Sequence, residues 1–315
     1  MSWNGWNLAS INMRSTDSSA VASRAPALPA RRSVRTAAVG RVGRLALEYV
    51  RRSDRTVFGR TTCQTPWHLL PPIYLDDSGS AYTLLVNPSG GLVGGDHLSI
   101  DLSVGAKAHA LISTPSANRV YRSLSQESTQ DITITVGEAG ILEWMPEHTI
   151  PFAGSRFRQN INVQLHPGAT LLLWDAVASG RIAHGERWRF TSLHNHIHIR
   201  MPSKAFLREQ FALAPGNPRR GAGLAASWDY VGSLFIVGDA VAASSWTALE
   251  GALAEILDNR HDGCMLGGVS QPSVPGLVVK LVTTSAPVMT QALMELWAAI
   301  RRILWNLPPV SLRKY

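Results

Sequence analysis

The sequence predicts a mainly β protein, with β-helix-like stacked or layered sheets and two α-helices in the C-terminal half of the chain. Three observations lead to this prediction. Short segments alternate apolar and polar residues, which is the pattern of a half-buried strand. A strand-turn-strand unit recurs along the middle of the chain, and two later segments have apolar stripes with helical spacing.

The alternating segments are the clearest strands. Residues 97–104, HLSIDLSV, place their apolar side chains on one face and their polar side chains on the other. Residues 131–136, DITITV, and residues 160–165, NINVQL, repeat this pattern. Each segment runs into a turn of small or polar residues and then a more apolar strand, as in VGAKAHALIST, VGEAGILEWMP and LHPGATLLLWDA.

These strand pairs recur at a regular interval. The strand-final residue Val136 follows Val104 by 32 positions, and Leu165 follows Val136 by 29. Units that recur at such a spacing bury their faces on their neighbours, as in a solenoid-like stack or a layered sandwich. We therefore expect a layered β scaffold from residue 41 to residue 315 as a single domain.

The first helix is predicted over residues 239–258, with Asp239 in the N-cap position. A stripe with helical spacing follows, formed by Trp246, Leu249, Leu253, Ile256 and Leu257. Such a stripe usually packs against a core. The residues before it, 213–229, are predicted to form a long loop because they are rich in Gly and Pro.

The second helix is predicted over residues 285–304. Ser285 and Pro287 suit its start, and Arg301 and Arg302 suit the negative end of its dipole. Its apolar stripe is formed by Met289, Leu293, Leu296, Trp297, Ile300 and Ile303. We expect this stripe also to face the core.

Residues 1–40 differ from the rest of the chain in composition. They are rich in Ser, Ala and Arg and contain one acid, Asp17, so we predict a disordered basic N-terminal extension, with organelle targeting as the alternative. Seven arginines in the first 44 positions supply most of the net charge of +8. The remainder is nearly balanced, which argues against a nucleic-acid partner.

Cysteine usage and hydropathy limit the location of the protein. Cys63 and Cys264 are the two cysteines of the sequence, too few for a disulfide framework or a four-thiolate zinc site. No run of 18 or more apolar residues occurs, so we predict no membrane span. A cytoplasmic location fits this composition best.

The segment NPSGGLVGGDHLSI, residues 87–100, has the most unusual composition of the chain. It resembles neither a P-loop nor a dinucleotide fingerprint, because no lysine follows the glycines and the next element alternates like a strand. Its glycines are expected to form tight turns, since glycine adopts positive φ without a steric penalty. Asp96, directly after these glycines, could also present its carboxylate to a passing cation.

Candidate metal ligands are scattered along the chain. His194, His196 and His198 alternate in LHNHIHIR, so on a strand their imidazoles lie on one face, either as weak nickel, copper or zinc ligands or as a polar row. Carboxylates near the strand ends could offer oxygen ligands along a cation path, or could simply be solvated, and they are Asp96, Glu143, Glu147 and Asp175.

Four ordered stretches together resemble the urease accessory protein family called UreD or UreH. They are NPSGGLVGGDHLSIDLSVGAKAHALISTPSANRVYRS, LEWMPEHTIPFAGSRF, LLLWDAVASGRIAHGERW and GLVVKLV. The resemblance covers residues 43–309. Asp175 and Met145 stand where relatives often have Glu and Leu, and the C-terminal residues 310–315 differ from the usual ending of the family.

The resemblance implies a function. Family members are β-helix-like scaffolds, not enzymes, that bind apo-urease, recruit the accessory F protein and through it the GTPase G protein, and help to deliver nickel. The nickel is transient and no cofactor is tightly bound. A nickel route through the scaffold is lined, by this resemblance, by polar residues of the matched motifs: Asp96, Glu143, Glu147, Asp175 and Arg181.

Two other functions remain open from the residues alone. One is a β-solenoid enzyme that acts on a polysaccharide with Glu143 and Glu147 as acid and base. The other is a basic nucleic-acid-binding module that uses the arginine-rich start of the chain. Deletion of residues 1–40 would separate the second from the scaffold.

Overall fold

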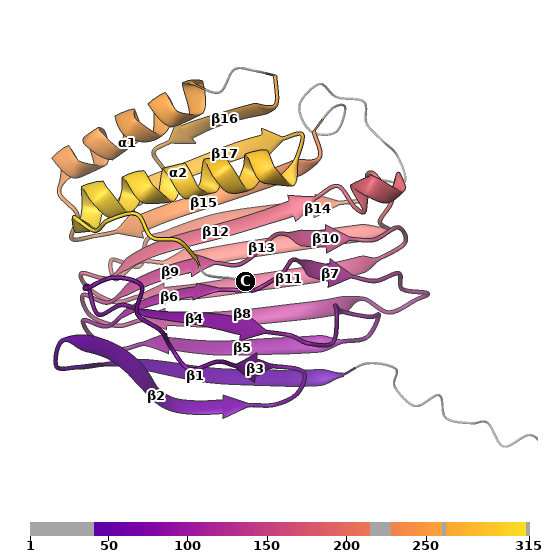
Figure 1. The fold of residues 1–315 in the computed structure, drawn as a ribbon, viewed down its shortest axis with the longest axis horizontal. Helices are drawn as coiled ribbons and strands as arrows, with labels where there is room; N and C mark the ends of the chain where they lie inside the picture. Colours follow the sequence, from indigo (N-terminus) through magenta and orange to yellow (C-terminus); the bar gives the residue numbers. More distant parts are fainter. Residues whose placement is uncertain (1–40, 215–227, 260–262, 313–315) are drawn as a thin grey trace, which may run out of the picture. The chain divides into compact units, whose positions relative to one another are not determined.

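The computed structural model describes residues 41–214, 228–259 and 263–312, all within one compact unit, residues 38–315. The basic extension predicted over residues 1–40 and most of the loop predicted over residues 213–229 lie outside the described residues. Between these limits the chain folds mainly into strands (Figure 1). In the described part of the chain, no helix is both long enough and apolar enough to span a bilayer.

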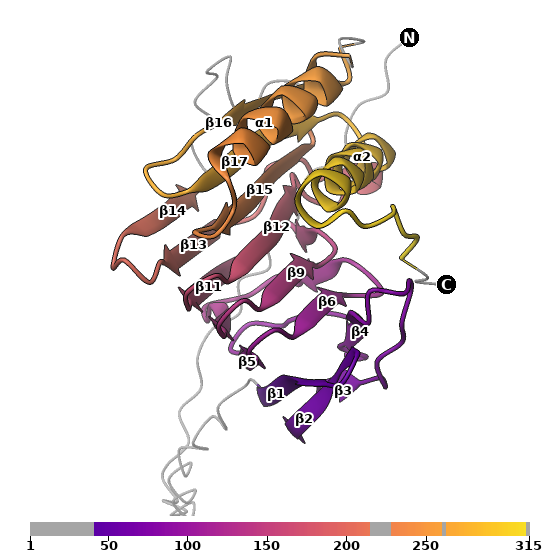
Figure 2. The same cartoon turned by 90° about the vertical axis from the view of Figure 1, so that its left-hand side faces the viewer.

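The strands form two sheets (Figures 1 and 2). The seven-stranded sheet has the order β14 (Phe206–Leu213), β13 (Ser192–Arg200), β11 (Arg156–Leu165), β8 (Ser128–Val136), β5 (His97–Val104), β1 (Val42–Arg52) and β2 (Arg55–Cys63). The main path of the ten-stranded sheet is β16 (Met265–Ser270), β17 (Gly276–Thr283), β15 (Tyr230–Gly238), β12 (Thr170–Ala178), β9 (Ile141–Met145), β6 (His109–Ser113), β4 (Ala81–Val86) and β3 (His68–Leu69). Two short strands beside this path are β7 (Asn118–Val120) and β10 (Thr149–Pro151).

The chain winds between the two sheets in about four coils, which confirms the predicted β-helix-like class. Strands β5, β8 and β11 are parallel neighbours in one sheet, and their partners β6, β9 and β12 are parallel neighbours in the other. The strand-final residues Val104, Val136 and Leu165 pair in register. The spacing of about 30 residues seen in the sequence is therefore the length of one coil.

The turns between the sheets are also stacked. The third residue after each strand end is left-handed: Lys107 with φ 56°, Ala139 with φ 50° and Gly168 with φ 75°. The amide of Lys107 donates to the Glu138 carbonyl, and the amide of Ala139 donates to the Pro167 carbonyl. The same turn is therefore used in three coils, although only one copy has the glycine that this conformation favours.

Apolar side chains fill two regions. One lies between the sheets and takes the inward residues of each alternating strand, such as Ile100, Ile132 and Ile161. The other lies on the outer face of the ten-stranded sheet, under helices α1 (Ala243–Asp258) and α2 (Ala286–Trp305) (Figure 2). Both predicted helical stripes face this second core, except that Ile256 and Ile303 are only half-buried.

Two details of the helix prediction were wrong. Helix α1 begins at Ala243, and Asp239 does not cap it but accepts a hydrogen bond from the Gly168 amide at 2.9 Å. Arg301 does not lie at the exposed end of helix α2. Its side chain is fully buried because it lies one turn beyond Trp297 on the buried face of the helix, and Arg302 is the basic residue of the last turn.

Candidate functional site

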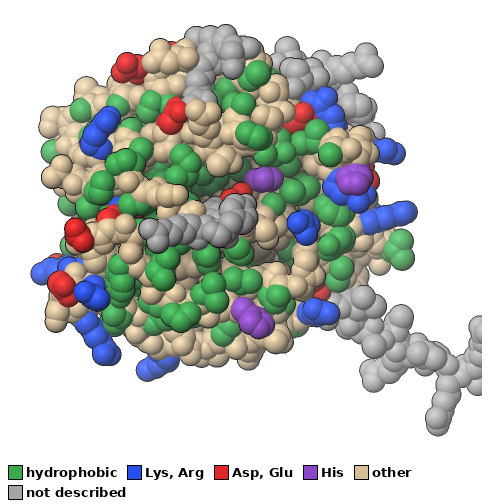
Figure 3. Space-filling model, viewed as in Figure 1, with side chains coloured by type: hydrophobic (Ala, Val, Ile, Leu, Met, Phe, Trp, Pro, Cys, Tyr) green, Lys and Arg blue, Asp and Glu red, His purple; other side chains and the backbone are tan. Residues whose placement is uncertain are grey.

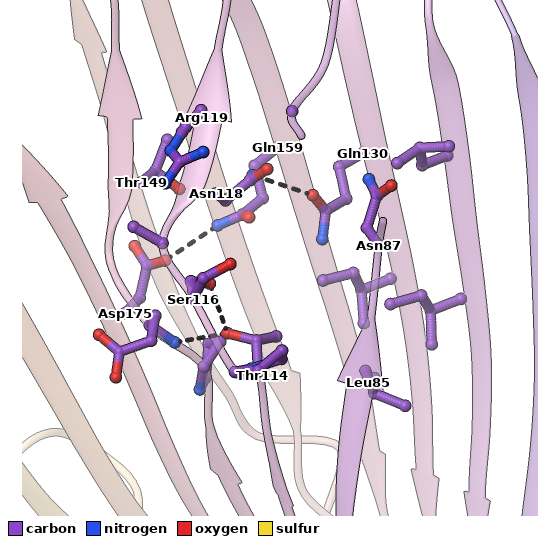
Figure 4. Close-up of a pocket in the computed structure, with 18 of the residues that line it drawn as sticks. Leu85, Asn87, Thr114, Ser116, Asn118, Arg119, Gln130, Thr149, Gln159 and Asp175 are labelled. Atoms are coloured by element: carbon purple, nitrogen blue, oxygen red, sulfur yellow. Dashed lines mark hydrogen bonds between the residues drawn. The ribbon is translucent and has the colours of Figure 1, made fainter. Parts of the chain in front are cut away.

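A cavity of about 90 Å³, lined by both apolar and polar side chains, lies between the two sheets (Figure 4). Its walls come from the seven-stranded sheet, the ten-stranded sheet and the segment that follows β6. Among its lining residues are Asn118, Gln130, Gln159, Glu147 and Asp175. A single water needs about 10–15 Å³ of such volume, so the cavity has room for several waters or a hydrated ion.

The register of the coils explains why amides gather here. Gln130 pairs with Gln159, and Gln159 pairs with Asn195, on neighbouring parallel strands. All three occupy inward positions because they continue the alternation of the apolar residues in their strands. Gln159 and Asn195 are 7% and 2% exposed, so these two amides are buried in an otherwise apolar interior.

Asp175 faces this row of amides from strand β12. Its Oδ1 accepts a hydrogen bond from Gln159 Nε2 at 3.0 Å (Figure 4), and its Oδ2 accepts one from Asn195 Nδ2 at 2.6 Å. Burial raises the pKa of Asp175, and the two amide hydrogen bonds oppose this effect only in part. The carboxylate is thus solvated by neutral dipoles instead of a cation.

The cavity lining has further unmet hydrogen-bonding capacity. Trp67 and Trp144 are both buried, and their indole nitrogens have no hydrogen-bond partner among the described residues. A buried indole N–H normally finds an acceptor. The residues that line the cavity therefore include two buried donors whose hydrogen bonds are not satisfied within the described part of the chain.

Glu147 lies where the cavity meets a groove on the outer surface. Pro146 and Glu147 line both spaces, and the Glu147 side chain is 22% exposed. His148 Nδ1 lies 3.6 Å from Glu147 Oε2. Glu147 therefore connects the interior of the coil to solvent.

The outer groove has a volume of about 610 Å³ and lies between helix α2 and the ten-stranded sheet. Its lining is largely apolar and includes Met145, Trp174, Met289, Met294 and Leu312. Figure 3 shows the face of the molecule that carries α2, where apolar side chains are frequent and the surface is hollowed near the centre of the view.

Glu143 does not reach the cavity, because it points from strand β9 to the opposite face of the sheet. Its Oε1 lies 2.6 Å from His109 Nε2 and 2.7 Å from Arg301 Nη1, and its Oε2 accepts a hydrogen bond from Trp297 Nε1. Arg301 also pairs with Asp76 and donates to the Pro308 carbonyl.

This network fixes the ionisation of Glu143. Burial alone would raise its pKa, but the hydrogen bond and charge of His109 and the charge of Arg301 outweigh burial and lower the pKa. Glu143 is 0% exposed and its oxygens are engaged. It is therefore inaccessible to a polymer, and nothing in its surroundings favours an acid and base pair with Glu147.

Asp96 and Arg181 also lie away from the cavity. Asp96 accepts hydrogen bonds from the amides of Arg41 and Val93, at 2.8 and 3.0 Å, and so closes the glycine-rich turn. Three of its four glycines, Gly90, Gly91 and Gly95, have the predicted positive φ, whereas Gly94 does not. Arg181 pairs with Glu186 at an outer corner of the coils.

The histidine row lies on the outer face of the seven-stranded sheet. His194, His196 and His198 alternate there with buried residues of strand β13, as the sequence predicts. His196 and His198 line a shallow hollow with Asp131, while His194 lies near Glu127. No group of three His, Cys, Asp or Glu residues with metal-binding geometry occurs among the described residues.

Of the residues selected from the sequence, the structure thus brings only Asp175 and Glu147 to the cavity. The amides were missed, although the signal was present. Counting back in steps of two from Ile132 and Ile161 reaches Gln130 and Gln159 on the buried face. Polar residues at inward positions of the alternating strands therefore indicate a polar site in the interior, whereas the positions of the carboxylates alone do not.

Comparison with known proteins shows the family of the chain. The family model described as UreD urease accessory protein matches residues 41–314. Proteins named urease accessory protein UreD are similar over most of their length: that of Deinococcus radiodurans is 32% identical over 87% of this chain and 95% of its own. That of Albidiferax ferrireducens is 32% identical over 85% and 96%, and that of Cupriavidus pinatubonensis is 31% identical over 85% and 92%. The chain belongs to the UreD family of urease accessory proteins.

Proposed function

We propose that this protein is a non-catalytic scaffold of urease maturation, which binds apo-urease and the accessory F and G proteins and helps to deliver nickel to the urease active site. The observation that carries the proposal is the buried Asp175 carboxylate at the wall of the cavity, whose hydrogen-bond partners among the described residues are two neutral amides. Family membership supports the role in urease maturation.

The chemistry of the cavity suits a cation that passes through. Asp175 offers a hard carboxylate ligand, and no cation among the described residues contacts it directly, since Lys280 lies two strands away on β17 and pairs with Glu209. Amide and hydroxyl groups supply weaker oxygen ligands. A route needs binding that is favourable enough for entry and weak enough for release, which a closed thiolate or imidazole site would not provide.

Glu147 extends this route toward the surface. It lies between the cavity and the groove beside α2, and its half-buried carboxylate is the second acid of the cavity lining. A nickel ion that enters by the groove meets Glu147 first and Asp175 second. Both steps use exchangeable oxygen ligands, so the water shell of the ion is never fully replaced.

Urease activation in vitro tests the proposal. Apo-urease, the F and G proteins, nickel, bicarbonate and GTP are mixed with the full chain, and urease activity is measured against the same mixture without it. The account predicts higher activity with the wild-type chain and lower activity with Asp175→Asn. Equal activity with and without the chain would contradict the scaffold role.

The matched control is Asp131→Asn. Asp131 is an aspartate on strand β8, but it lies on the outer face of the seven-stranded sheet, where it accepts a hydrogen bond from Asn160. The proposal requires this variant to activate urease like the wild type. A similar loss in both variants would indicate a general charge effect instead of a route through the cavity.

A further inference from the structure

A second hollow lies at one corner of the coils and has no part in the cavity. We call it the corner hollow, and its lining residues are Val93, Tyr121, Arg122, Phe152, Ala153, Gly154, Arg181, Glu186 and Arg189. These residues come from the same corner of four successive coils, after β4, β7, β10 and β12. In Figure 1 this is the right-hand end, where the 3₁₀ turn η1 (Ile182–His184) lies.

One side of the corner hollow is fixed by an ion pair. Arg181 Nε donates to Glu186 Oε2 at 2.8 Å, and Arg181 Nη2 pairs with Glu186 Oε1. The guanidinium also lies 4.4 Å from the centre of the Phe152 ring, and Glu186 accepts a hydrogen bond from the Ala153 amide. Because the pair is bidentate and stacked, it is a rigid wall whose charges cancel.

The other cations of the corner hollow are not neutralised. Arg122 and Arg189 are exposed, and neither has an ion-pair partner within the described part of the chain. Gly154 lies between them: its amide donates to the Arg189 carbonyl, and a side chain at this position would come within 3.1 Å of Arg122 Cγ. Gly154 also has a φ of 74°, so glycine suits this close approach.

Apolar side chains flank these cations. Val93 lines the corner hollow and is 43% exposed, and Leu124, which is outside the lining but only two residues after Arg122 in sequence, is 89% exposed. Cationic side chains are visible at this end of the molecule in Figure 3. Arginine beside exposed apolar groups is the composition of a protein-protein interface, whereas a small inorganic anion would leave the apolar groups unused.

We infer that the corner hollow docks an acidic segment of a partner protein, with its carboxylates on Arg122 and Arg189 and an apolar side chain against Val93 or Leu124. The charge of the two arginines and the apolar flank together select this occupant. The inference rests on the proposed function, because the partners to be tested are apo-urease and the F protein.

The experiment measures binding of the full chain to each of these proteins, at about 50 mM and about 300 mM salt, because screening weakens contacts between exposed charges. The double variant Arg122→Glu with Arg189→Glu reverses both cations of the corner hollow. The matched control is Arg60→Glu with Arg208→Glu, which makes the same charge change at two exposed positions on edge strands. Circular dichroism melting confirms that both variants fold.

We expect the corner variant to lose about 30-fold or more in affinity for one partner at low salt, the scale of an arginine hot spot. The affinity of the control variant should change little, and salt should weaken the binding of only the wild type and the control.

Unchanged binding by the corner variant, or an equal loss in the control, would overturn the inference while the proposed function stands. Phosphate that binds the wild type without affecting partner binding would assign the hollow to a small anion and overturn it too. Failure of the wild type to bind either protein would contradict the proposed function itself.

Discussion

Two buried carboxylates on the same ten-stranded sheet, Glu143 and Asp175, lie on opposite faces and meet opposite environments. Glu143 faces helix α2 and contacts His109 and Arg301, so its pKa is lowered. Asp175 faces the space between the sheets and contacts two neutral amides, so its pKa is raised. A carboxylate that is paired with buried cations, such as Glu143, stabilises the fold. A carboxylate with neutral hydrogen-bond partners, such as Asp175, can still bind a metal cation that enters the cavity.

The largest expected effect is on the paired carboxylate. Glu143→Gln would leave the buried Arg301 with Asp76 as its remaining carboxylate partner, and breaking a buried ion pair costs up to about 3–5 kcal/mol. We therefore expect the free energy of unfolding in urea to fall by about this amount. Arg301→Met together with Glu143→Gln should recover part of the loss. Full stability of the single variant would refute the anchoring role of Glu143.

Asp175→Asn should change stability little but lower urease activation strongly. Asparagine keeps the size of the side chain and removes a charge that burial disfavours, but its NH2 group would face one of the two amide donors, so stability should fall by less than about 2 kcal/mol. Urease activation should nevertheless fall by about tenfold or more, the scale on which the loss of a metal partner lowers affinity. A variant that is stable and fully active would show that Asp175 does not serve the route.

The same two variants should differ in how pH changes their stability in metal-free solution. The pKa of Glu143 is lower in the folded state than in the unfolded state, so its contribution to stability is present above the unfolded pKa and is lost as the pH falls through the folded pKa. The raised pKa of Asp175 works in the opposite direction, because its ionisation as the pH rises costs stability in the folded state.

Unfolding in urea between neutral pH and about pH 3.5 checks these signs. The deficit of Glu143→Gln should shrink as the pH falls. The deficit of Asp175→Asn should instead grow at low pH, where the wild-type carboxyl becomes protonated. If the deficit of Glu143→Gln grew toward low pH, the sign of its pKa shift would be wrong.

The smallest effect is expected for the histidine row. Its three imidazoles lie on the outer face of the seven-stranded sheet, so replacing His194, His196 and His198 together by Ala should change activation by less than about twofold. Calorimetric titration with nickel would reveal any weak binding by the row. An activation loss as large as that of Asp175→Asn would instead place the histidines on the route.

Much of the fold could be predicted because its strands and helices follow from the spacing of apolar residues within short segments. The alternation that ends at Val104, Val136 and Leu165 defined the coils, and the helical stripes defined the outer core. The Glu143 network could not be predicted, since Arg301 is 158 positions away in sequence and neither residue carries a local mark of its partner. Asp239 was misassigned because a carboxylate before a helix suits a cap and a distant turn amide equally well.

The candidate site was only partly predictable for the same reason. The resemblance to UreD selected carboxylates by motif, and motifs do not say which face of a strand a residue occupies. Glu143 and Asp175 both follow apolar runs in the sequence, yet one points to the helices and the other to the amides. Inward polar residues such as Gln159 were the better guide, because alternation specifies the face.

The central claim is that a nickel ion can occupy the cavity beside Asp175. Anomalous X-ray diffraction at the nickel edge, from crystals of the full chain grown with nickel, tests it directly. The account predicts a nickel peak within coordination distance of the Asp175 carboxylate, about 2.0–2.2 Å, which is absent in Asp175→Asn. Nickel found only at the histidine row, or unchanged in the variant, would contradict it.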